Sequence, residues 1–203
     1  MSAPTDYRFN LDAIDGHVIT LREIPYVPML KCIVLTAQEQ VFLRRGMFSK
    51  LCSHSRVINK LRMKQKDNRV FIRLSSISAK DVCIEWSAST EEILKQMISS
   101  WRVQEDLDEA LVRQAPVSLC VLPWKTFKRE YRTFVTPTRV WTRDDTGVLV
   151  EDSRFSAWAD QLRTALNAND FVFDMGDSDE YGLTFIECNQ LDETTDEYLP
   201  KSE

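Results

Sequence analysis

The stretch Phe171-Val-Phe-Asp-Met-Gly-Asp-Ser-Asp-Glu-Tyr-Gly-Leu-Thr-Phe-Ile-Glu-Cys-Asn189 decides the fold that this chain can adopt. Two apolar, β-type runs flank a short polar turn, which is the pattern of a β-hairpin. Residues two apart on a strand face the same side, so Glu187 and Asn189 can be directed at one point, which Asp174 can reach from the neighbouring strand. Two carboxylates and an amide carbonyl are hard oxygen ligands of the kind that Mg²⁺ prefers. The alternative is a hairpin whose acids serve solubility alone.

Composition places the chain among globular proteins and excludes several classes of site. With 203 residues, 43% of them hydrophobic and 28% charged, it is long enough for one sizeable domain or two small lobes. No apolar run approaches a membrane span and the first residues lack the features of a signal peptide, so we expect a cytoplasmic protein without membrane contact. The five cysteines show no CxxC spacing, and the four that lie in apolar or strand-like runs are expected to be buried free thiols. Only five glycines are present, so any phosphate would have to be bound by side chains.

Charge is distributed unevenly along the chain. Between Arg44 and Arg73 the sequence is rich in Lys and Arg, and Asp67 is the only acid there. From Asp170 to Glu203 it is as strongly acidic, with Lys201 as the only base. A basic block of this kind can bind nucleic acid or another polyanion, but it can also be the solvated face of a helix. The sequence leaves both interpretations open.

The order of the predicted elements indicates an α+β fold. Strands that pair through hairpins alternate with sets of helices, which is the pattern of that class. The predicted strands are 31–36, 69–74, 82–86, 117–122, 130–135, 139–141 and the two of the hairpin; the predicted helices are 37–63 with a break near Gly46 or Cys52, one opened by the capping box Ser89–Glu92, 103–114 and 154–167. The expected organisation is an irregular lead-in (1–29), a first lobe (30–115), a second lobe (116–191) and an acidic tail (192–203).

Four segments in this order resemble one family. They are Val70-Phe-Ile-Arg-Leu-Ser-Ser-Ile-Ser-Ala-Lys-Asp81, Leu119-Cys-Val-Leu-Pro-Trp124, Glu130-Tyr-Arg-Thr-Phe-Val135 and the hairpin from Phe171 to Asn189. Together they resemble the cell division cycle 123 family, a branch of the ATP-grasp fold, over roughly residues 70 to 190. The resemblance implies two small α+β lobes with antiparallel sheets around a nucleotide cleft, and it implies ATP and Mg²⁺ as ligands.

The same resemblance assigns roles to individual residues. It implies phosphate contacts from Arg73, Lys80, Arg132 and Arg143, backbone contacts to adenine from Cys120, Val121 and Leu122 on a hinge strand that ends at Trp124, and metal binding by Asp174, Glu187 and Asn189. Lys80 could equally be an ordinary exposed lysine, and the hinge a plain core strand. Arg132 could be a structural partner of Glu130 or of the acidic hairpin, and without a nucleotide we expect the hairpin acids to form salt bridges with it. The family often has a basic residue before the hinge tryptophan, where this chain has Pro123.

Three functions follow from these observations. The first is an ATP-dependent enzyme, a carboxylate–amine ligase or a kinase-type phosphoryl transferase, for which no catalytic residue is identified. The second, implied by the family, is a non-catalytic nucleotide-dependent assembly factor that binds a protein such as a translation initiation factor subunit. The third is a polyanion-binding module that uses the basic block 44–73, which would make nucleic acid a partner.

Overall fold

The computed structural model describes residues 29–180 and 182–191, so the predicted acidic tail and nearly all of the predicted lead-in lie outside the described residues. The chain divides after Trp124 into an N-terminal unit, Pro28–Trp124, and a C-terminal unit that begins at Lys125. The predicted lobe boundary at 115/116 lies earlier in the chain than this division. Strand β3 (Val117–Pro123) pairs with strands β1 (Lys31–Leu35) and β2 (Val70–Leu74), so it belongs to the first lobe.

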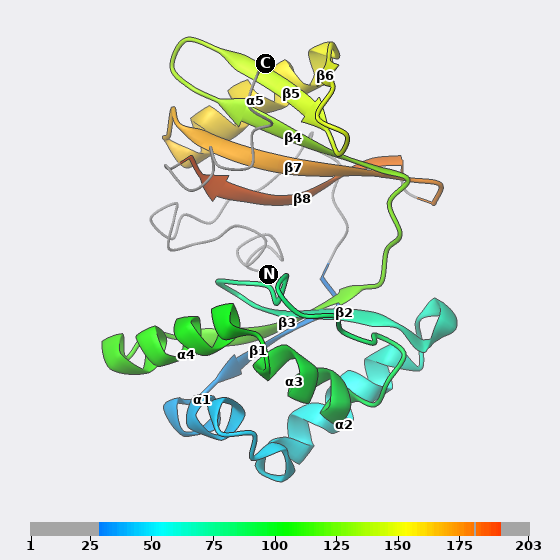
Figure 1. Ribbon diagram of the computed structural model, residues 1–203, viewed down its shortest axis with the longest axis vertical. Coiled ribbons are helices and arrows are strands. Elements are labelled where there is room, and N and C mark those ends of the chain that lie inside the picture. The colour runs from blue at the N-terminus through cyan, green and yellow to red at the C-terminus, as the bar shows by residue number, and fades with distance from the viewer. Residues whose placement is uncertain (1–28, 181, 192–203) are drawn as a thin grey trace. The chain divides into compact units, whose positions relative to one another are not determined.

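The N-terminal unit is built on a three-stranded antiparallel sheet in the order β1-β3-β2. Alternate residues of each strand, such as Ile33, Ile72 and Leu119, are buried in one apolar core with the helices. Figure 1 shows these helices on one face of the sheet. They are α1 (Ala37–Arg44), α2 (Cys52–Arg62), α3 (Thr90–Ile98) and α4 (Trp101–Arg113), with 3₁₀ turns at Phe48–Leu51 and Lys66–Asn68.

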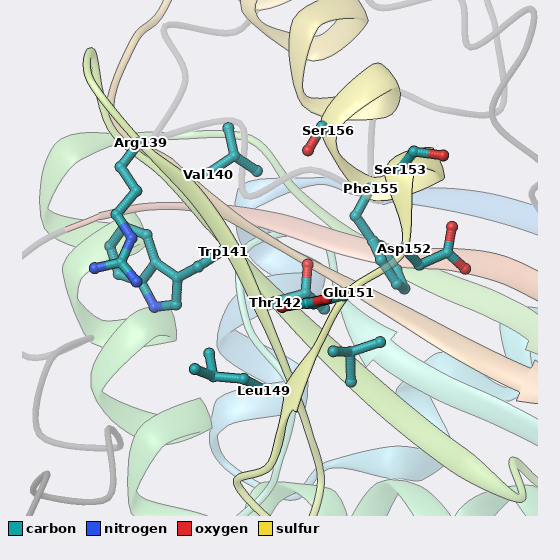
Figure 2. Close-up of a pocket in the computed structure, with 11 residues that line it drawn as sticks. Arg139, Val140, Trp141, Thr142, Leu149, Glu151, Asp152, Ser153, Phe155 and Ser156 are labelled. Carbon is teal, nitrogen blue, oxygen red and sulfur yellow. The ribbon is translucent and has the colours of Figure 1, made fainter.

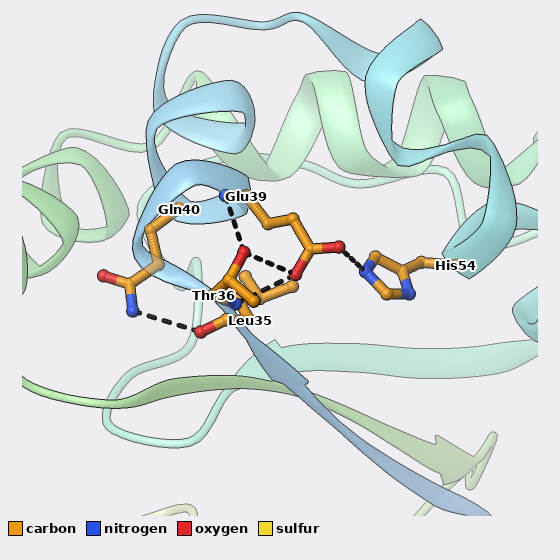
Figure 3. Close-up of polar contacts among 5 residues, drawn as sticks. All are labelled: Leu35, Thr36, Glu39, Gln40 and His54. Carbon is orange, nitrogen blue, oxygen red and sulfur yellow. Dashed lines mark hydrogen bonds and ion pairs between the residues drawn. The ribbon is translucent and has the colours of Figure 1, made fainter.

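Local sequence explains where α1 begins and ends. Figure 3 shows a capping box in which the Thr36 hydroxyl accepts a hydrogen bond from the Glu39 amide at 3.2 Å, while the Thr36 amide donates to the Glu39 carboxylate at 2.9 Å. His54 from α2 lies 2.8 Å from the other Glu39 oxygen. The backbone hydrogen bond from Thr36 is the main reason that the pKa of Glu39 is lowered. Gly46, in the left-handed region at φ 67°, follows the helix and confirms the predicted break.

The connector between β2 and α3 differs from the prediction. Residues 82–86, predicted as a strand, have no strand conformation. Their apolar residues Val82, Ile84 and Trp86 instead pack against the core of the N-terminal unit as part of an irregular segment. Asp81, just before them, accepts hydrogen bonds from the Ser100 hydroxyl and from the Trp101 amide, and so helps to cap α4.

The C-terminal unit is built on a five-stranded antiparallel sheet in the order β6-β5-β4-β7-β8 (Figure 1). One helix packs on one face of this sheet through Phe155, Trp158 and Leu162. The elements are β4 (Arg129–Val135), β5 (Val140–Asp144), β6 (Leu149–Val150), α5 (Ser153–Leu166), β7 (Phe171–Ser178) and β8 (Gly182–Gln190). The predicted hairpin is therefore confirmed as β7–β8.

Alternation along the strands gives this sheet two different faces. Alternate residues of β4 and β7 face α5, and most of them belong to the apolar core that this helix covers. They include Tyr131, Thr133, Phe171 and Phe173. The residues between them lie on the opposite face, which we call the open face of the C-terminal sheet because α5 does not cover it. Phe134, Val172, Asp174 and Glu187 on this face are nevertheless buried. No helix in the described part of the chain is long and apolar enough to cross a membrane.

Candidate functional site

A row of charged residues crosses the open face of the C-terminal sheet. Arg143 on β5 is the register partner of Arg132 on β4, Arg132 is the partner of Asp174 on β7, and Asp174 is the partner of Glu187 on β8. Side chains at directly opposed positions of neighbouring strands point to the same face. Two cations and two anions therefore lie side by side, in sign order, over four strands.

The centre of this row is a two-pronged ion pair. Arg132 donates from Nε to Asp174 Oδ1 and from Nη2 to Asp174 Oδ2, both at 2.8 Å. The Asp174 side chain is 11% exposed and that of Arg132 is 33% exposed, so the pair is partly shielded from water. The hydrogen bonds from Arg132 to Asp174 are the main cause that raises the pKa of Arg132, and the charges of Glu187 and Glu130 add to it. The prediction that the hairpin acids offset Arg132 is confirmed for Asp174.

A β-bulge in β8 determines the sheet face on which Glu187 and Asn189, the remaining candidate metal ligands, lie. The register passes from Asp174–Glu187 to Met175–Phe185, so Ile186 is the extra residue on β8. Beyond it Glu187 faces Asp174 and Asn189 faces Val172, which places Glu187 and Asn189 on the open face, as predicted. Nothing in the sequence around Ile186 signalled the bulge.

The intervening Cys188 points the other way, into the core against α5. Burial, with smaller contributions from the charges of Asp174 and Glu187, raises the pKa of its thiol well above the usual value. The acids of the open face therefore lie directly across the sheet from an apolar interior. The apolar interior does not stabilise a charged group on the open face, so such a group needs polar or oppositely charged partners on that same face.

The donor set on the open face fits Mg²⁺ better than a softer metal. Within the described residues no group of three or more His, Cys, Asp or Glu side chains gathers around one point. Asp174, Glu187 and Asn189 offer only oxygen ligands, which suits an ion that keeps part of its water and shares phosphate oxygens. Arg132 already engages both Asp174 oxygens, so a metal would have to compete with it or arrive together with an anion that takes over the arginine.

The N-terminal unit holds the other predicted ligand residues. Arg73 lies on β2, on the sheet face opposite the helices, where it is 7% exposed. Its Nε donates to the Leu74 carbonyl at 3.1 Å. Lys80 is exposed in the connector after β2, where its amide bonds to the Ser78 carbonyl at 2.9 Å. Arg73 is thus a buried cation and Lys80 a surface one.

The predicted hinge is the central strand of its sheet. Cys120 pairs with Cys32 and Arg73, and Val121 with Lys31 and Ile72, so the backbones of Cys120 and Val121 lie within the sheet rather than at an edge. Adenine contact by their backbone groups stays a prediction, and their position between two neighbouring strands argues against it. Leu122 has its register partner in β2 only, so the end of the strand, from Leu122 to Trp124, keeps that role as a proposal.

Trp124 has aromatic and cationic neighbours. Its ring centroid lies 5.8 Å from that of Trp86, and the Arg69 guanidinium lies 5.9 Å from the Trp124 ring. These distances fit tilted aromatic packing and a cation–π contact. Trp124 is therefore held by its own unit at the point where the N-terminal unit ends.

The basic block 44–73 separates into two groups. Arg44 pairs with Asp108 at 2.8 Å, Arg62 bonds to the Ser87 and Ala88 carbonyls, and Arg73 is buried. These residues hold the N-terminal unit together. Arg69 is partly buried and lies over the Trp124 ring. The remaining cations are exposed on or next to α2: Arg45, Lys50, Arg56, Lys60, Lys64 and Lys66.

A pocket that the sequence did not predict lies on the C-terminal unit. It has a volume of about 440 Å³ and is lined by β5, β6 and the start of α5 (Figure 2). Arg139 lies over the Trp141 ring, 5.1 Å from its centroid, at one side of the pocket, and Asp152 caps α5 at another. None of the predicted ligand residues lines it. The pocket and the charged row are separate features of this unit.

The geometry defines a class of protein: two α+β units, each with an antiparallel sheet covered by helices on one face. No family model and no curated protein matches the sequence. Among solved structures, Cdc123 from Schizosaccharomyces pombe is similar with a TM-score of 0.59 and 17% identity, over 92% of this chain and 83% of that chain. A C-terminally truncated form of the same protein has a TM-score of 0.56 and 19% identity, over 87% and 82%. The RimK domain ATP-grasp protein from Sphaerobacter thermophilus is similar at a TM-score of 0.42 and 10% identity, over 92% and 58%.

The two similarities to Cdc123 establish the fold. The chain has a Cdc123-like fold, and the predicted α+β class with two antiparallel sheets is confirmed. At such low identity the comparison assigns no role to any single residue, so the ligand residues stay predictions that rest on their own geometry.

Proposed function

We propose that this protein binds Mg-ATP, with Asp174, Glu187 and Asn189 as metal ligands and Arg132 and Arg143 as phosphate contacts. The observation that carries the proposal is the charged row on the open face of the C-terminal sheet. A magnesium–triphosphate complex presents both signs of charge at once, a cation for the acids and phosphate oxygens for the arginines. A single row that offers both kinds of partner side by side suits such a ligand.

The ion pair between Arg132 and Asp174 suggests how binding proceeds. In the protein alone each side chain neutralises the other. When the triphosphate gives Arg132 a new anionic partner, the Asp174 oxygens become available to Mg²⁺. Metal and nucleotide should then bind cooperatively, with Mg²⁺ alone binding weakly. The guanidinium fork of Arg132, which now grips a carboxylate at two points, can grip two phosphate oxygens in the same way.

The N-terminal unit carries the other residues that were predicted to contact ATP. Arg73 and Lys80 are the phosphate candidates and the segment from Leu122 to Trp124 is the adenine candidate. Bound Mg²⁺ and arginines would neutralise charge on a transferred phosphoryl group, the chemistry that an ATP-dependent ligase or kinase needs. Formation of ADP in the presence of a carboxylate and an amine would identify a ligase. Binding without turnover would favour the assembly-factor role implied by the family resemblance.

Calorimetry on matched variants tests the proposal. Mg-ATP titrated into the parent should bind, and Asp174→Asn should weaken binding at least tenfold. The matched control is Asp177→Asn, three residues further along β7, where the side chain lies on the other face of the sheet and binding should be unchanged. Titrations of MgCl₂ alone and of ATP with EDTA should each give much weaker binding than the two together. Absence of binding at millimolar Mg-ATP refutes the proposal.

A second candidate function has its own observation. The exposed cations include Arg56 and Lys60, which are spaced at i and i+4 on one side of α2, and Lys64, which follows shortly after the end of the helix. Such a group of cations suits a polyanion such as single-stranded RNA. Binding of RNA that falls steeply with salt and is lost in Lys60→Glu/Lys64→Glu, while Mg-ATP binding stays intact, would establish this function beside the first.

A further inference from the structure

Two cysteines face each other across the N-terminal sheet. Cys32 on β1 and Cys120 on β3 are direct register partners in an antiparallel pair. Cys120 is fully buried and Cys32 is half-buried. Their chain neighbours Ile33, Leu119 and Val121 belong to the helix-covered core, so by alternation both thiols lie on the opposite face of the sheet.

The hydrogen-bond pattern shows which kind of cross-strand pair this is. The Ser75 amide donates to the Ser118 carbonyl at 2.9 Å, so the backbone groups of Ser118 point towards β2. Backbone groups alternate in direction along a strand, so those of Cys120 also point towards β2. The Val121 carbonyl points the other way, since it accepts from the Leu30 amide at 2.9 Å on the β1 side. Cys32 and Cys120 are therefore a non-hydrogen-bonded pair, the kind in which opposed side chains come closest.

This arrangement fits a disulfide. Opposed Cα atoms in a non-hydrogen-bonded pair are about 4.5 Å apart, at the short end of the range of about 4.4–6.8 Å over which cysteines can be bridged. Cys32 is partly exposed, and exposed disulfides are among the more easily reduced ones. The sheet itself holds the two residues in register, so no large movement of the backbone is needed.

We propose that Cys32 and Cys120 form a reversible disulfide when the N-terminal unit meets an oxidant. With a peroxide as oxidant, the Cys32 thiol is converted to a sulfenic acid and one water is released. The Cys120 thiol then attacks that sulfur, the S–S bond forms and the second water leaves. With a small-molecule disulfide as oxidant, Cys32 first forms a mixed disulfide, and Cys120 displaces the small thiol. In both routes two thiols lose two electrons and two protons to the oxidant.

Accessibility assigns the order of these steps. Cys32 is the partner that an oxidant can reach, and Cys120 lies behind it. The other cysteines do not compete for the same bond: Cys52 and Cys83 are exposed but lie outside the strands, and Cys188 is fully buried in the C-terminal unit. The bridge would tie the first strand of the sheet to its centre, in the row that continues to Arg73, the register partner of Cys120 on the other side.

Counting thiols tests the proposal. The full chain with Cys52→Ser/Cys83→Ser keeps three of the five cysteines. After treatment with oxidised glutathione, removal of the reagent and alkylation with N-ethylmaleimide under denaturing conditions, intact mass should show one alkylated thiol instead of three, no glutathione adduct, and full recovery with dithiothreitol. Peptide mapping should link Cys32 to Cys120. With Cys120→Ser added, Cys32 should instead remain as a glutathione adduct.

The matched comparison is the parent chain, in which peptide mapping without any substitution should find the same Cys32–Cys120 link. This excludes a pairing created by the variants. Three alkylated thiols after oxidation, a link that involves Cys188, or a Cys32–Cys120 link that forms only in urea would each overturn the proposal. None of these readouts depends on nucleotide binding, so the result is independent of the function proposed above.

Discussion

Replacing Arg132 by Ala should destabilise the C-terminal unit by about 2–3 kcal/mol at neutral pH. Removing one partner of a buried ion pair costs about 3–5 kcal/mol because the other charge is left without compensation, whereas exposed pairs contribute about 0–1 kcal/mol. Asp174 is 11% exposed and Arg132 is 33% exposed, so the pair falls between these limits. The loss arises because Asp174 and Glu187 would face each other without the cation that now bonds to Asp174.

Urea denaturation followed by circular dichroism measures this loss, and hydrogen exchange of β4 and β7 peptides locates it in the C-terminal unit. Three controls separate the ion pair from other effects of the substitution. Asp174→Asn alone and Arg132→Ala/Asp174→Asn complete a double-mutant cycle, in which the double variant should be more stable than Arg132→Ala because the carboxylate that Arg132 compensates is removed as well. Arg129→Ala removes an arginine of the same strand whose side chain is 53% exposed, and should change stability far less.

The pH dependence has a definite sign. The deficit of Arg132→Ala comes from the lost attraction between the arginine and the Asp174 carboxylate, so it should be full at about pH 7 and should shrink as pH falls towards about 4, the ordinary range in which aspartate loses its charge. A free energy of unfolding within about 0.5 kcal/mol of the parent, the range of an ordinary surface substitution, would refute the reasoning, and so would a deficit that does not change with pH.

The same variant also decides the role of Arg132 in binding. If Arg132 contacts phosphate, Arg132→Ala should weaken Mg-ATP binding by about 1–3 kcal/mol, the range for a charge-assisted hydrogen-bonding group. If only stability falls and affinity is unchanged, Arg132 is a structural partner of Asp174 alone.

Three further results are expected. Gly176→Ala should lower stability by about 1–3 kcal/mol in a urea titration, because an added Cβ would lie 2.3 Å from a ring carbon of Phe127; an unchanged midpoint would show that the ring moves aside at no cost. Asp81→Asn should lower stability by about 0.5–1 kcal/mol at pH 7 but have little effect below about pH 3. Burial raises the pKa of Asp81, but the hydrogen bonds from the start of α4 outweigh burial and lower it, so the stabilisation is present above the unfolded-state pKa of about 3.9 and is lost as pH falls through the folded-state pKa. Equal losses of stability at the two pH values would contradict this explanation. Glu187→Gln should leave or slightly raise the melting temperature without metal while it weakens Mg-ATP binding, because one of two neighbouring carboxylates is neutralised; a large loss of stability would mean that Glu187 has a structural partner instead.

Much of the fold could be predicted because it depends on local rules. The alternating runs around Asp174 and Glu187 identified the hairpin, and the start of α3 followed from the Ser89 cap, whose hydroxyl accepts from the Glu92 amide. The break after α1 followed from Gly46. In each case the deciding interactions join residues within a few positions of one another, so a short window of sequence contains them. The order of four such segments then identified the family resemblance, which the structural comparison confirms at the level of the fold.

Other features could not be read from the sequence. The segment 82–86 has the composition of a strand but finds no partner strand and packs as irregular chain against the core. Strand β3 lies in the N-terminal unit because it pairs with β1 and β2, both distant in sequence. The bulge at Ile186 and the pocket beside Trp141 depend on how strands and helix meet.

The sequence by itself therefore determined the element types, the hairpin and the residue types of the candidate site. Only the tertiary structure decided that Arg132 bonds to Asp174, 42 positions away, and that Cys32 faces Cys120. The physical reason is that periodicity fixes which side of a strand a residue takes, whereas the register between strands is chosen by burial of the whole sheet face against its helices. A shift of one residue in that register would keep every local preference and separate both pairs.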